Sequence, residues 1–100
     1  PVDVAIEFTH PDAAVGNLRW ALQKGWPVVV GTTGWYDHLP EIKADVARLN
    51  GALLYASNFS LGVNLFFKLN EYLARLMGAH PTYDVVLDET HHTQKRDAPS

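Results

Sequence analysis

The stretch Pro27-Val28-Val29-Val30-Gly31-Thr32-Thr33-Gly34 decides the fold of this 100-residue chain. Three consecutive β-branched residues without a polar interruption are typical of a strand that is buried on both faces of a parallel sheet. The strand runs into a loop of glycine and threonine, where a backbone can approach a ligand closely and hydroxyl and amide groups can hydrogen-bond its polar edge. An ordinary strand-to-helix turn has the same composition, so spacing alone leaves both interpretations open.

Strands and helices alternate around this central strand. Residues 2–8 alternate between apolar and polar or small side chains, which predicts a strand. Apolar residues at helical spacing predict one helix over residues 11–24 and another over residues 39–49, and a third strand follows over residues 52–56. Because a helix separates each pair of strands, we expect an α/β fold with a partial Rossmann-like, doubly wound sheet.

Three loops follow the carboxyl ends of the predicted strands, at residues 8–12, 31–35 and 56–62. Ligands of doubly wound sheets bind beyond these strand ends, so we expect the three loops to share one edge. The third loop begins Ala56-Ser57-Asn58-Phe59. Its amide and aromatic ring could pack against a flat ligand ring, or could simply close the loop.

A different pattern begins after the third loop. Apolar residues recur at helical spacing and predict a longer helix over residues 65–78, and a strand is predicted over residues 83–89. This helix has its own hydrophobic face. We therefore expect a domain boundary near residues 60–64.

Composition narrows the class of protein. The chain is 47% hydrophobic, has a formal charge of -3 and contains no cysteine. It lacks the basic surplus of a nucleic-acid-binding protein, and its apolar runs fall far short of the roughly 18 residues that a membrane span needs. We expect a soluble, cytoplasmic chain with no nucleic-acid or membrane partner.

Residues 2–8 have the pattern of an interior strand, and residues 90–100 complete no element, so we also expect a natural polypeptide that is longer at both ends.

The polar segment over residues 89–100 concentrates groups that can carry chemistry. Its sequence is Glu-Thr-His-His-Thr-Gln-Lys-Arg-Asp-Ala-Pro-Ser. A solvated loop is the ordinary interpretation of such a cluster. Adjacent histidines do not easily face one tetrahedral ion, and no His-x-x-x-His pair or cysteine accompanies them, so we expect no metal site. Imidazoles beside a lysine-arginine pair would suit an anionic, dicarboxylate substrate next to a proton donor.

The pattern His91-His92-x-x-Lys95-x-Asp97-Ala98-Pro99-Ser100 resembles a motif of the dihydrodipicolinate reductases, also called 4-hydroxy-tetrahydrodipicolinate reductases. Phe8-Thr9, Gly31-Thr32-Thr33-Gly34 and Asn58-Phe59-Ser60-x-Gly62-Val63-Asn64 match the same family in order and approximate spacing. The resemblance covers essentially all of residues 3–100. It implies reduction of dihydrodipicolinate to tetrahydrodipicolinate with NADH or NADPH, in lysine and diaminopimelate biosynthesis, by a homotetramer of the full-length polypeptide.

The resemblance also implies a role for each matching residue. His91 matches a proton donor or acceptor, and Lys95 matches a second proton donor beside a substrate carboxylate. His92 and Ser100 match substrate contacts. The positions that match the cofactor-binding loops are Phe8, Thr9, Gly31, Thr32, Thr33, Ala56, Ser57, Asn58 and Phe59.

In this interpretation, residues 1–60 are the C-terminal part of a dinucleotide-binding domain, and residues 61–100 begin a substrate-binding and oligomerisation domain of α+β type. The glycine-rich turn that would bind the cofactor pyrophosphate is absent from the chain, and so is the Gly-Thr pair expected after Ser100. We therefore expect little or no turnover by this chain alone. Two alternatives remain: another two-domain Rossmann dehydrogenase, and a nucleotide-sensing module that kept the fold without the chemistry.

Overall fold

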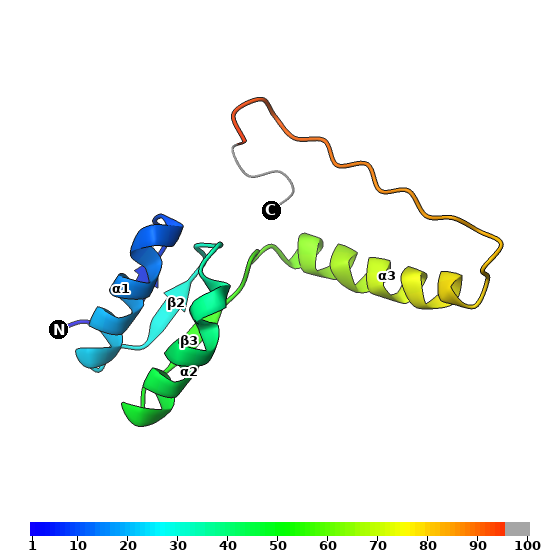
Figure 1. Ribbon diagram of the computed structural model, residues 1–100. Coiled ribbons are helices and arrows are strands. Elements are labelled where there is room, and N and C mark those ends of the chain that lie inside the picture. The colour runs from blue at the N-terminus through cyan, green and yellow to red at the C-terminus, as the bar shows by residue number, and fades with distance from the viewer. Residues whose placement is uncertain (96–100) are drawn as a thin grey trace. The chain divides into compact units, whose positions relative to one another are not determined.

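The computed structural model describes residues 1–95 of the chain (Figure 1). One compact unit comprises Pro1–Phe59, and a second unit begins at Ser60. The first unit contains β1 (Ala5–Glu7), α1 (Pro11–Gln23), β2 (Val28–Val30), a short 3₁₀ helix (Tyr36–His38), α2 (Leu39–Arg48) and β3 (Leu53–Tyr55). The second unit contains α3 (Leu61–Gly78).

The three strands form one parallel sheet in the order β1-β2-β3. Val29 at the centre of β2 is in register with Ile6 of β1 on one side and Leu54 of β3 on the other. A helix occupies each crossover, as parallel neighbours require. The predicted α/β fold is therefore confirmed, and the sequential strand order is that of one half of a doubly wound, Rossmann-like sheet.

Both helices of the first unit cover the same face of this sheet. α1 and α2 contact each other, and α1 also contacts β1 and β2. On the opposite face, Ile6 is 71% exposed and Leu54 is 57% exposed. The apolar core consequently lies between the sheet and the two helices, and its buried members are Ala14, Leu18, Ala21, Leu22, Val28, Val30, Trp35 and Ile42.

The ends of the helices follow the sequence signals. The imidazole of His10 accepts a hydrogen bond from the backbone N–H of Asp12 at 3.4 Å, and Pro11 occupies the first turn of α1. α3 begins in the same way, because the hydroxyl of Ser60 accepts from the N–H of Val63 at 3.4 Å. The predicted helix over residues 65–78 is thus confirmed, with a start four residues earlier at Leu61.

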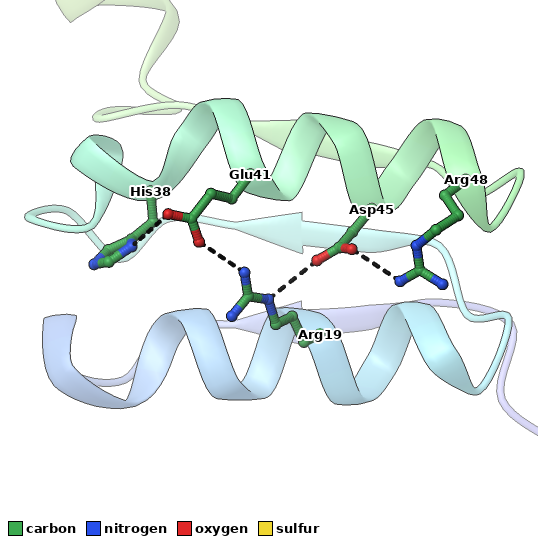
Figure 2. Close-up of polar contacts among 5 residues, drawn as sticks. All are labelled: Arg19, His38, Glu41, Asp45 and Arg48. Carbon is green, nitrogen blue, oxygen red and sulfur yellow. Dashed lines mark hydrogen bonds and ion pairs between the residues drawn. The ribbon is translucent and has the colours of Figure 1, made fainter.

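A row of charged side chains links α1 to α2 on their solvent side (Figure 2). Arg19 of α1 donates to Glu41 at 2.8 Å and to Asp45 at 3.0 Å, both on α2. Asp45 also accepts from Arg48 at 2.9 Å, and His38 lies 3.7 Å from Glu41. Hydrogen bonds from Arg48 and Arg19 hold the pKa of Asp45 below its ordinary value.

The predicted strand over residues 83–89 is wrong. Residues 83–90 form no strand in the described part of the chain, and the side chains of Val85, Val86 and Leu87 are exposed. A β-branched, apolar sequence can adopt an extended backbone, but a strand also needs a neighbour that accepts its backbone hydrogen bonds.

Among residues 1–95, none of the helices is long and apolar enough to span a membrane.

Candidate functional site

The loops that follow β1 and β2 meet at one pocket on the carboxyl edge of the sheet. The pocket has a volume of about 260 Å³. All of the cofactor-binding positions predicted in these two loops are among its lining residues. The lining consists of Phe8, Thr9, Pro11, Gly31, Thr32 and Thr33.

The aromatic ring of Phe8 lies against the backbone of Gly31. A Cβ at residue 31 would be 2.0 Å from Phe8 Cε1, so only glycine leaves the ring where it is. Phe59, in the loop after β3, contacts the same ring with a centroid separation of 6.1 Å. Both phenylalanine rings are exposed. They therefore present aromatic surface at the edge where the strands end.

The rest of the third loop contributes less than the sequence predicts. The backbone N–H of Ala56 donates to the carbonyl of Val30 at 3.4 Å, which holds the start of the loop beside β2. Neither Ala56, Ser57 nor Asn58 is among the residues that line the pocket. The structure thus brings Phe59 to the first two loops through its contact with Phe8, and the roles predicted for the other three residues remain predictions.

Next to the pocket lies a buried carboxylate that sequence reasoning did not single out. Glu7, the last residue of β1, is 6% exposed. It accepts hydrogen bonds from the hydroxyls of Thr9 and Thr32, and from Asn17 Nδ2 at 3.2 Å. Burial raises the pKa of Glu7, but the hydrogen bonds from Thr32, Thr9 and Asn17 outweigh it and leave the pKa below its ordinary value. One feature of the sequence could have pointed to Glu7. It is the single acidic residue among the apolar residues at the end of the predicted first strand.

Thr32 is fixed from three directions. Its hydroxyl donates to Glu7, its Oγ1 accepts from the backbone N–H of Thr9 at 2.8 Å, and its carbonyl accepts from the indole Nε1 of Trp35 at 2.7 Å. Trp35 is itself buried. Because the hydroxyl hydrogen of Thr32 is committed to Glu7, the groups left for a ligand in this loop are backbone atoms and the half-buried Thr33.

The predicted catalytic histidine has an acidic neighbour in the second unit. His91 Nε2 lies 2.9 Å from Glu89 Oε2. The backbone N–H of Lys95 donates to the carbonyl of His92 at 3.1 Å, which closes a turn between these two predicted functional residues. Ser100, the second predicted substrate contact, lies outside the described residues. Within residues 1–95, histidine and carboxylate side chains form no group of three or more that could hold a metal ion.

Comparison with known proteins gives matches along the whole chain. Residues 1–59 match the family model described as dihydrodipicolinate reductase, N-terminus, and residues 62–100 match dihydrodipicolinate reductase, C-terminus. A 4-hydroxy-tetrahydrodipicolinate reductase of Christiangramia forsetii is 46% identical over 99 residues, which are 99% of this chain and 41% of the relative.

Two reductases of the same name from other organisms are also similar. The protein of Methanocaldococcus jannaschii is 40% identical over 98% of this chain and 35% of its own length, and that of Methanoculleus marisnigri is 44% identical over 98% of this chain and 38% of its own length. The chain thus spans between 35% and 41% of the length of the curated relatives that it matches. Because the two family models together cover nearly all of its residues, the chain belongs to the dihydrodipicolinate reductase family.

Proposed function

We propose that this chain is part of a reductase that converts 4-hydroxy-tetrahydrodipicolinate to tetrahydrodipicolinate with NADH or NADPH, in lysine and diaminopimelate biosynthesis. The three relatives compared above carry the name of this reductase. The observation that carries the proposal is the pocket between the loops after β1 and β2, which we call the strand-end pocket. The residues predicted to bind the cofactor in each of these two loops line this one space. It lies at the edge where α/β sheets bind their ligands.

The residues at this pocket fit the nicotinamide end of a dinucleotide. A volume of about 260 Å³ is smaller than a complete small-molecule site, which typically measures roughly 300–1,000 Å³, and it suits one flat ring. Gly31 leaves room for the Phe8 ring against its backbone, Phe8 offers an aromatic surface to the pocket, and Thr33 can hydrogen-bond a polar substituent. When bound, the nicotinamide supplies the hydride.

In this proposal the second unit handles protons and the substrate. His91 holds the proton that completes the reduction, since imidazole exchanges protons near neutral pH. Glu89, 2.9 Å away, orients the imidazole. Lys95 stabilises negative charge on the dicarboxylate substrate as it reacts, and His92 and Ser100 contact that substrate.

We also propose that the two units belong to different functional domains. The division of the chain at residue 60 and the two family matches on either side of it support a cofactor domain followed by a substrate-binding and oligomerisation domain. The complete polypeptide would be a cytoplasmic homotetramer. Light scattering of a full-length protein tests the oligomeric state, and a monomeric mass would contradict it.

The activity can be tested in a chimera in which this chain replaces the 99 matching residues of the Christiangramia forsetii relative. We call this protein the full-length carrier. It should oxidise NADH or NADPH only when 4-hydroxy-tetrahydrodipicolinate is present. A carrier that binds the cofactor but shows no turnover would contradict the proposed function and favour a nucleotide-sensing role.

Two substitutions in the carrier test the assigned roles. His91→Gln and Lys95→Ala should each lower kcat by about 100-fold or more, the usual contribution of a general acid or base, while cofactor binding persists. His80→Gln is a matched control, because His80 is also an exposed histidine of the second unit. Activity that survives both substitutions would remove the catalytic assignment.

A further inference from the structure

We propose that Glu7 is a positioning residue of this site, whose carboxylate fixes the two threonines at the strand-end pocket and thereby sets the affinity for the nicotinamide cofactor. The inference rests on the proposed function. Glu7 is not among the residues that line the pocket, whereas Thr9 and Thr32 are. Any effect of Glu7 on a ligand in the pocket is therefore transmitted through these two side chains.

The hydrogen bonds of Glu7 join the ends of two strands. Its Oε2 accepts from the hydroxyl of Thr32, after β2, and its Oε1 accepts from the hydroxyl of Thr9, after β1. Asn17 of α1 donates to Glu7 Oε1 at 3.2 Å and to Thr9 Oγ1 at 3.3 Å. A single carboxylate thus ties both lining loops to each other and to the helix behind them.

A charged carboxylate is the group that this arrangement requires. An ionised carboxylate only accepts hydrogen bonds, so it can receive all three donors at once, and such charge-assisted bonds are stronger than neutral ones. The side-chain donors are two hydroxyls and an amide, and in the described part of the chain no lysine or arginine pairs with Glu7. Burying an anion with neutral partners costs more than burying an apolar side chain at the same place.

The network also decides which groups of Thr32 face the pocket. Its hydroxyl hydrogen points to Glu7, and its Oγ1 receives the backbone N–H of Thr9 at 2.8 Å. Replacing Glu7 with glutamine would turn one acceptor oxygen into an NH₂ donor. The hydrogen of one threonine hydroxyl must then turn away from residue 7, and the charge-assisted hydrogen bonds that join the two loops become weaker, neutral ones.

Kinetics of the full-length carrier test this role. Glu7→Gln and Thr32→Val should each raise the KM for the cofactor by about tenfold, the effect of roughly 1.4 kcal/mol of lost binding, with a much smaller change in kcat. Thr32→Ser keeps the hydroxyl and should behave like the parent. The effect of the double variant should be smaller than the sum of the two single effects, because both changes remove the bond between Glu7 and Thr32.

The matched control is Glu41→Gln, which neutralises an exposed glutamate of α2 away from the pocket. Its KM for the cofactor should equal that of the parent. A Glu7→Gln carrier whose KM stays within about twofold of the parent would overturn the proposal, since Glu7 would then not set the affinity for the cofactor.

Residue-resolved hydrogen exchange of the carrier provides a readout that does not depend on turnover. In Glu7→Gln, the Thr9 amide, which donates to Thr32 Oγ1, should exchange at least about tenfold faster. The Val28 amide, which donates to the Ala52 carbonyl at 2.9 Å, should keep its protection. Faster exchange at both amides would indicate general destabilisation, and unchanged exchange at both would show that Glu7 holds nothing in place; either result overturns the proposal. Absence of turnover in the parent carrier would instead contradict the proposed function alone.

Discussion

Phe8 lies so close to Gly31 that a Cβ added at residue 31 would be 2.0 Å from Phe8 Cε1. The atoms that it would meet belong to the outer part of a side chain that is 63% exposed. The ring can therefore be pushed aside without a shift of the backbone. In its new place it would no longer contact Phe59 or line the pocket as it does now. A side chain at residue 31 would thus change the shape of the pocket more than it would change the stability of the fold.

Gly31→Ala in the full-length carrier should raise the KM for NADH or NADPH by about tenfold, the effect of roughly 1.4 kcal/mol of lost binding, while Tm changes little. Steady-state kinetics and thermal unfolding measure the two effects. Gly16→Ala is the control, because a Cβ at this exposed position of α1 meets nothing within 4 Å. It should leave KM unchanged and raise stability by about 0.5–1 kcal/mol. An unchanged KM in Gly31→Ala would show that the ring position does not matter for binding.

The ion pairs between α1 and α2 predict a pH-dependent contribution to stability. Because the pKa of Asp45 is lower in the folded chain than its ordinary value, its ionised form stabilises the fold. This contribution is complete above the unfolded-state pKa of about 3.9 and disappears as the pH falls through the lower, folded-state pKa. Asp45→Asn should therefore lower Tm at neutral pH, and the difference from the parent should vanish in strong acid.

Thermal unfolding over a range of pH and salt checks this prediction. The pairs lie at the surface, so the effect of Asp45→Asn should be modest and should shrink in high salt. Asp37→Asn is the control, since Asp37 is exposed and makes no ion pair within residues 1–95. A Tm difference for Asp45→Asn that persists unchanged into acid would contradict the assignment to its charge.

Glu89 lies 2.9 Å from His91, and its replacement should lower kcat less than the replacement of His91 itself. If Glu89 orients the imidazole, then Glu89→Gln in the carrier should lower kcat by about tenfold, less than the loss of roughly 100-fold expected for removal of the proton-transfer group. The KM for the cofactor should not change. Asp88→Asn, which alters the exposed acid next to it, should have wild-type kinetics. A Glu89→Gln carrier with the kcat of the parent would leave the 2.9 Å pair without a role in catalysis.

The order of elements and the edge that carries the pocket could be predicted because they depend on local patterns. The three valines of β2 and the glycines that end the helices fix where each element begins and ends, and parallel strands bring their carboxyl ends to one edge. This is why Thr9 and Thr32, which are 23 residues apart, could be expected at the same site, and they are joined by a 2.8 Å hydrogen bond.

The burial of Glu7 and the absence of a strand at residues 83–89 could not be predicted in the same way. Alternation along β1 shows which side chains share a face, but the face that is covered depends on where the helices pack. A strand likewise depends on a partner whose position no local pattern specifies. The missed features are those that depend on distant parts of the chain.

The choice of buried face in the first unit can itself be tested with two aliphatic residues. Leu18 of α1 is completely buried, whereas Ile6 of β1 is 71% exposed. In the 100-residue chain, Leu18→Ala should lower the free energy of unfolding by about 2–5 kcal/mol, because it leaves a cavity in the core. Ile6→Ala should lower it by less than about 1 kcal/mol, since the side chain is mostly in solvent and mainly β-propensity is lost. Urea denaturation measures both values. Equal losses would mean that the face of Ile6 is covered as well, and the helices would then not define the only core of this unit.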